Sequence, residues 1–66
     1  MKYKIMIQGH MDVKWADWFD GMQIVHEDDG TTTLYGTVID QAALQGILKK
    51  INNLSLELIS VNKING

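Results

Sequence analysis

Polar and apolar residues alternate along the first segment of the chain, from Lys2 to Met11. One side of an extended chain here carries Tyr3, Ile5, Ile7 and Met11, and the other carries Lys2, Lys4, Met6, Gln8 and His10. A period of two residues is typical of a β-strand that buries one face. The segment therefore predicts a strand, and Gly9 lies where we expect that strand to end.

Two further extended segments flank a turn. Residues 22–27 alternate again, and residues 31–39 are rich in β-branched side chains, which suit a pleated strand. The turn between them reads Asp-Asp-Gly at residues 28–30, where glycine adopts a positive φ at low cost. The pattern predicts a β-hairpin, with Leu34 and Val38 pointing into the core.

A short helix is predicted between the first strand and the hairpin. Asp12 can accept backbone hydrogen bonds at its start, and Gly21 can take the left-handed conformation that ends a helix. The spacing i, i+3, i+4 puts Trp15, Trp18 and Phe19 on one face. Helices shorter than about 12 residues are marginal in water, so we expect these aromatic side chains to hold this one on the sheet.

The longest amphipathic pattern begins at Asp40, which is a favourable N-cap residue. Its apolar stripe has helical period and consists of Ala43, Leu44, Ile47, Leu48, Ile51 and Leu54. Glycine in a helix interior costs about 1 kcal/mol relative to alanine, so Gly46 leads us to expect close packing of the helix on a strand. Asn52 and Asn53 are expected to end the helix.

The last segment, residues 56–64, is apolar but does not alternate cleanly, which a β-bulge or a strand buried on both faces would explain. The element order is then β-α-β-β-α-β, the split βαβ or ferredoxin-like arrangement of an α+β protein, with a very short first helix or a loop in its place. Right-handed crossovers put both helices on one face of a four-stranded antiparallel sheet, in the spatial order fourth, first, third, second strand. We assign residues 1–66 to one domain.

Composition narrows the possible functions. The 66 residues include only two histidines and no cysteine. The absence of cysteine excludes disulfides and fits a reducing compartment. No signal peptide follows Met1 and no apolar stretch approaches the roughly 20 residues that cross a bilayer, so we expect a cytoplasmic protein without membrane contact. There is no arginine, and the net charge is −2, so nucleic-acid binding is not expected.

Two groups of sequences resemble this chain. Residues 15–21, 26–32, 40–48 and 58–61 together resemble a group of small uncharacterised bacterial and archaeal proteins of about 65–70 residues, a likeness that implies no established activity. A weaker likeness is to ACT-type regulatory domains, in which a helix also opens with an aspartate and the following strand is similar to residues 56–61. The glycine that those domains place near the start of this helix is replaced here by Ala42 or Ala43, which weighs against amino-acid binding.

The candidates for chemistry are few. His10 and Asp12 form an His-x-Asp pair and three acids follow His26, so these three residues could hold a divalent metal. Ordinary strand-end and turn residues explain the same pattern, and we expect no metal or other cofactor. His10 could also act as a general base oriented by Asp12 or Asp17, but a monomer of this size can hardly enclose a catalytic pocket. We therefore do not expect an enzyme.

Two surfaces are candidates for partners. Trp15 and Trp18 lie in the segment from Asp12 to Asp40, which carries seven acids and one lysine. This segment could attract a protein partner. The alternatives are that the aromatic side chains pack on the sheet and that the acids form a solvated surface. The sheet face away from the helices is expected to show Met6, Val25, Tyr35 and Ile59. A symmetric homodimer would bury that face. The sequence thus predicts a self-associating interaction or regulatory module, with a small-molecule-binding ACT-like domain and a metal-dependent enzyme as alternatives.

Overall fold

The computed structural model describes residues 1–19 and 22–64. In chain order the elements are β1 (Lys2–Gln8), the 3-10 helix η1 (Val13–Phe19), β2 (Gln23–His26), β3 (Thr31–Thr37), α1 (Gln41–Asn53) and β4 (Leu58–Ile64). The four predicted strands and the predicted helix after Asp40 are present, and the class is α+β. No described helix is long and apolar enough to cross a membrane.

The short helix differs from its prediction in type. Residues 13–19 form a 3-10 helix, not an α-helix, so α1 is the one α-helix of the described chain. Seven residues allow few i→i+4 hydrogen bonds, and 3-10 geometry is common in such short pieces. Its predicted cap is confirmed: Asp12 Oδ1 accepts the backbone N–H of Lys14 at 2.9 Å. Asp20 and Gly21, where the sequence places the end of this helix, lie outside the described residues.

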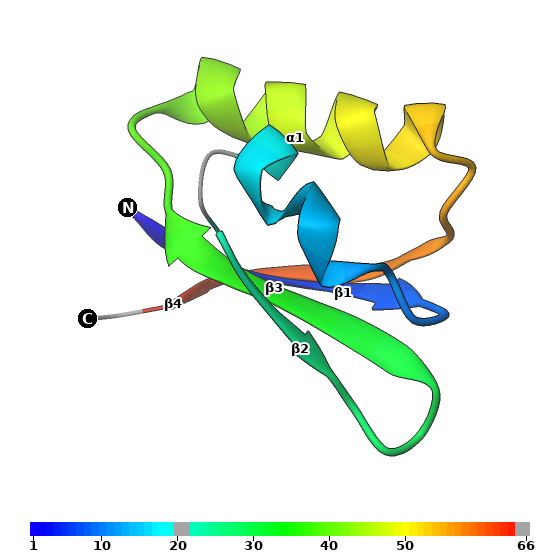
Figure 1. Cartoon of the computed structure of the whole chain (residues 1–66). Coiled ribbons are helices and arrows are strands. Elements are labelled where there is room, and N and C mark those ends of the chain that lie inside the picture. The colour runs from blue at the N-terminus through cyan, green and yellow to red at the C-terminus, as the bar shows by residue number, and fades with distance from the viewer. Residues whose placement is uncertain (20–21, 65–66) are drawn as a thin grey trace.

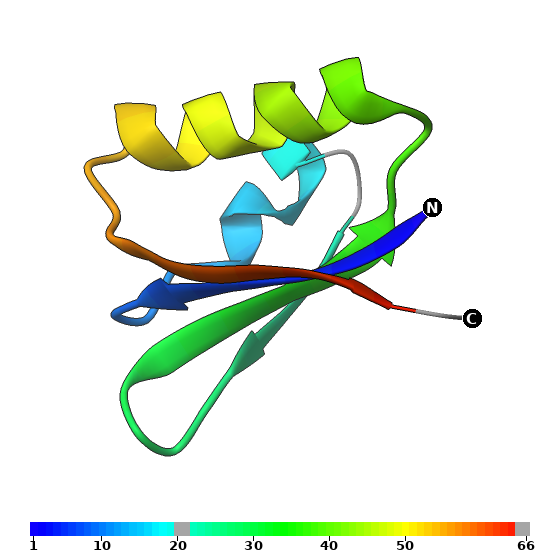
Figure 2. The same cartoon turned by 180° about the vertical axis from the view of Figure 1, so that it is seen from behind.

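The strands form one antiparallel sheet in the order β2-β3-β1-β4, the predicted order counted from the other edge. Figure 1 shows α1 and η1 on the same side of this sheet. The view from behind in Figure 2 shows the same two layers, with neither helix below the sheet. The buried core lies between the layers, and the opposite sheet face is uncovered.

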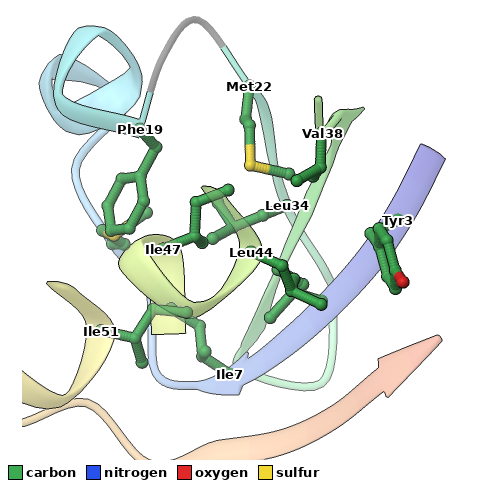
Figure 3. Packing of buried hydrophobic residues seen from close by; sticks show 11 residues of the cluster. Tyr3, Ile7, Phe19, Met22, Leu34, Val38, Leu44, Ile47 and Ile51 are labelled. Atoms are coloured by element: carbon green, nitrogen blue, oxygen red, sulfur yellow. The ribbon is translucent and has the colours of Figure 1, made fainter. Parts of the chain in front are cut away.

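The core contains the expected faces of the strands and of α1 (Figure 3). Its members are Tyr3, Ile5, Ile7, Met11, Phe19, Met22, Leu34, Val38, Leu44, Ile47 and Ile51. Successive side chains of a strand point to opposite faces, so burial of Ile5 and Ile7 fixes the outward direction of Lys4 and Met6.

The helix caps explain where α1 begins and ends. Asp40 Oδ1 accepts the backbone N–H of Ala43 at 2.9 Å, as predicted for an N-cap. After the last turn, Ser55 has a φ of +60°, and the backbone N–H of Leu56 donates to Ile51 O at 3.2 Å. This closure is the one that glycine usually provides after a helix. Serine here holds a left-handed conformation without the freedom of glycine.

The expectation about Gly46 was wrong. A Cβ atom placed on Gly46 would have no neighbour within 4 Å, so no strand packs closely there. The close approach occurs at Gly36 of β3, where a Cβ atom would lie 2.8 Å from Met22 Cγ. The core therefore requires a glycine in the sheet, while the glycine of the helix has open space beside it.

β4 contains the irregularity that its sequence suggested. Its pairing with β1 shifts register between Met6 and Ile7, because Met6 lies opposite Ser60 whereas Ile7 lies opposite Leu58. Ile59 is the extra residue of this β-bulge and is 47% exposed. Of the two explanations that the sequence allowed, the bulge is confirmed.

Candidate functional site

The sheet face that neither α1 nor η1 covers is called the open face here. Cα pairing across the strands sets its rows. One row contains Val25, Thr33, Met6 and Ser60, the next contains Gln23, Tyr35, Lys4 and Asn62, and the third contains Thr37, Lys2 and Ile64. The open face therefore combines a few apolar side chains with many polar ones.

Three of the four predicted open-face residues lie together in these rows. Met6, Val25 and Tyr35 are half-buried, and they surround Thr33, which is fully buried although no helix covers this face. The fourth predicted residue, Ile59, is the extra residue of the bulge, so Ser60 and not Ile59 lies opposite Met6. Ile59 is therefore outside the regular rows of the open face.

Charges on the open face are separated along the strand direction. Lys2 lies at one end of the central strand β1, and Lys4 follows one row later, with its Nζ 5.9 Å from the centre of the Tyr35 ring. The other end carries the hairpin turn with Glu27, Asp28 and Asp29. Six residues of strand between Lys2 and Gln8 span about 20 Å. The face thus has a basic end and an acidic end.

The acidic end is held in place by threonines. Thr33 Oγ1 donates to Glu27 Oε1 at 3.0 Å, which fixes this carboxylate on the open face. Asp29 Oδ1 accepts from Thr31 Oγ1 at 2.6 Å and from the Thr31 backbone N–H at 3.1 Å. These hydrogen bonds stabilise the ionised carboxylate, so they lower the pKa of Asp29 below its ordinary value. Asp29 therefore keeps its negative charge to a lower pH than an aspartate without these hydrogen bonds.

A hollow lies at the basic end of the open face. It has a volume of about 460 Å³ and is lined by Lys2, Gln23, Tyr35, Gly36, Thr37 and Ile64. Small-molecule sites commonly have volumes of about 300–1,000 Å³, but they are largely enclosed. This hollow is instead open to solvent.

The indole pair, Trp15 and Trp18, lies on the other side of the molecule, on η1. The two ring centroids are 5.2 Å apart, and Trp18 meets Phe19 edge-on at 5.6 Å. Phe19 is fully buried whereas Trp18 is 38% exposed, so Phe19 is the residue that anchors η1 in the core. Lys50 of α1 reinforces this contact, since its Nζ donates to Trp18 O at 2.6 Å. Part of the Trp18 side chain therefore stays exposed on η1.

The two histidines lie together, as the metal hypothesis requires, but in a different geometry. Their rings stack with centroids 4.8 Å apart and planes 9° apart. His10 Nε2 donates to Glu27 O at 3.1 Å, and His26 Nε2 donates to Met11 O. A carbonyl oxygen only accepts, so each Nε2 carries its hydrogen. The pair ties the loop after β1 to the end of β2.

This stacking does not suit a shared metal ion. A metal lies in the plane of each imidazole that binds it, and two stacked parallel rings have no common in-plane point. Asp12, the third predicted ligand, is instead the cap of η1. Within the described part of the chain, no three side chains of His, Cys, Asp or Glu converge as a metal site.

Sequence reasoning missed two features of the open face: the buried threonine beneath its apolar residues and the separation of its charges. The second had a signal, because Lys2 and Lys4 alternate outward at the start of β1 while the acids cluster in a turn. Recognising it required the strand order, which brings the far end of β1 beside that turn.

A family model described as "Domain of unknown function (DUF8691)" matches residues 2–62. No curated protein and no solved structure matches the chain.

Proposed function

Because the chain belongs to this family, whose description assigns no activity, we propose its role from its surfaces: a non-enzymatic module that self-associates through the open face. The observation that carries this proposal is the placement of Met6, Val25 and Tyr35 side by side on a sheet face without a covering layer. Apolar side chains grouped in this way and rimmed by charges are typical of an interaction surface. A second copy of the chain would supply the missing layer.

The size of the open face sets the strength of the association. Four strands about 4.8 Å apart and up to about 20 Å long give a flat area of about 400 Å² per copy, or about 800 Å² in total, which is below the range of stable complexes and within that of weak, transient ones. We therefore expect a dimer with a dissociation constant in the micromolar range, suited to a regulatory module. The proposal includes a ferredoxin-like arrangement, with η1 in place of the first helix, and a cytoplasmic location.

Analytical ultracentrifugation over a wide range of protein concentrations tests self-association. We expect a monomer–dimer equilibrium that Met6→Lys or Tyr35→Glu abolishes while the far-UV circular dichroism stays unchanged. Trp18→Ala is the control, because Trp18 lies on the helical side of the molecule. A strict monomer at high micromolar concentration would contradict the proposal.

The hollow at the basic end favours a second candidate function, a small-molecule-binding regulatory domain with its ligand at the dimer interface. A second copy would close the hollow on its open side. A ligand that binds only the folded state raises the melting temperature, so a thermal-shift screen with amino acids and nucleotides tests this candidate. Absence of any shift at millimolar ligand would contradict it.

A further inference from the structure

The separated charges of the open face specify which way two copies face each other. Lys2 lies at one end of this face, Lys4 lies in a central row beside Tyr35, and Glu27, Asp28 and Asp29 lie at the other end. Parallel stacking of two such faces would put like charges opposite each other at both ends. A two-fold axis that runs across the strands reverses the strand direction of the partner, and each basic end then faces an acidic end.

We propose that the chain forms an antiparallel face-to-face homodimer in which the Lys2 end of each copy meets the Glu27–Asp29 turn of the other. This inference rests on the proposed self-association and adds its orientation. The axis passes near Met6 and Tyr35, which lie between the two charged ends. Residues near a two-fold axis lie close to their own copies, so these side chains form the centre of the contact, with Lys4 beside Tyr35, and Lys2 and the acidic turn form its rim.

The acidic end is suited to this role because its carboxylates are already positioned. Thr33 holds Glu27, and Thr31 holds Asp29, through the hydrogen bonds described above. Side chains that are ordered before association lose less entropy when they pair. Asp28 is exposed and belongs to the same turn, so it is free to face a lysine of the partner.

Charge reversal tests the orientation. Lys2→Glu and Asp28→Lys should each weaken dimerisation by about tenfold, because symmetry makes every reversed pair occur twice. The double variant Lys2→Glu/Asp28→Lys should restore the dimer, since the two reversed charges attract across the interface. Matched controls are Lys49→Glu on α1 and Asp17→Lys on η1, which change the net charge equally on exposed helical positions.

Engineered cysteines give a second readout, and the absence of native cysteine makes it unambiguous. Under mild oxidation, an equimolar mixture of Lys2→Cys and Asp28→Cys proteins should form a disulfide-linked heterodimer. Lys2→Cys protein alone should stay monomeric on a non-reducing gel. Efficient linkage of Lys2→Cys to itself would overturn the antiparallel arrangement.

The outcomes separate this inference from the proposed function. A wild-type protein that never dimerises would remove both. A dimer that Met6→Lys abolishes, but that neither Lys2→Glu nor Asp28→Lys weakens, would keep the open face as the interface and overturn its orientation. A weakening that Lys49→Glu reproduces would show an effect of net charge alone and would also overturn it.

Discussion

One substitution, glycine to alanine, should have opposite effects at two positions of this chain. At Gly36 the added Cβ atom would lie 2.8 Å from Met22 Cγ and 3.3 Å from Met22 Cβ. At Gly46 it would meet nothing within 4 Å. Both residues have backbone conformations open to alanine, because neither is among the glycines with positive φ. Packing and helix propensity alone should therefore decide the sign.

The structure sets the size of each effect. Inserting a methyl group into a packed core costs about 1–3 kcal/mol, and Met22 is 97% buried, with its Cβ fixed to the backbone. Alanine at Gly46 should stabilise the helix by about 1 kcal/mol. A domain of this length has an unfolding free energy of about 3–10 kcal/mol, so both changes are readily measured. In melting temperature, each kcal/mol corresponds to about 4–8 °C.

Urea unfolding followed by circular dichroism gives the free energies, with all variants at one protein concentration because association raises apparent stability. The double variant Gly36→Ala/Met22→Ala should cost less than the sum of its single changes, because removing the Met22 side chain beyond Cβ makes space for the new methyl group. If Gly36→Ala and Gly46→Ala shift stability in the same direction, or if the double variant is additive, this account of the packing is wrong.

Two further predictions concern the turn and the helix end. Hydrogen bonds from Thr31 lower the pKa of Asp29, so Asp29 contributes stability above the pKa of its unfolded state, about 3.9, and loses that contribution as the pH falls through the lower folded value. Urea titrations from pH 2 to 7 should therefore show that the stability of Asp29→Asn depends less on acid than that of the wild type. An unchanged acid dependence would contradict the role of Asp29. Ser55→Gly should stabilise the protein by about 1 kcal/mol, because a φ of +60° is strained for a residue with a side chain. Asn53→Gly, within α1, is the control and should destabilise the protein. Thermal melting measures both changes.

Much of the fold follows from local patterns. The alternation of β1, the Asp-Asp-Gly turn and the stripe of α1 each depend on a few neighbouring residues, and each was predicted from them. The type of η1 was not, because an isolated seven-residue segment has no stable helical form and takes its geometry from the burial of Phe19.

The candidate site was predictable only where the strand register is regular. Met6, Val25 and Tyr35 lie on regular stretches, so alternation placed them on the open face. The sequence of the last strand indicated a bulge but not its position, and a shift of one residue moves a side chain to the other face. That shift put Ser60 where Ile59 was expected.

The central position of β1 has a consequence for how the chain is made. β1 is synthesised before both of its partner strands, and one of them, β4, comes after all the other described elements. Pairing Met6 with Ser60 closes a loop of about 54 residues, whereas pairing His26 with Thr32 closes about 6, a difference of about 2 kcal/mol in closure entropy. The β2–β3 hairpin should therefore form early, whereas one edge of β1 stays unpaired until β4 has been synthesised. During that interval the nascent chain exposes an apolar strand to other polypeptides, which makes its translation the stage most vulnerable to aggregation.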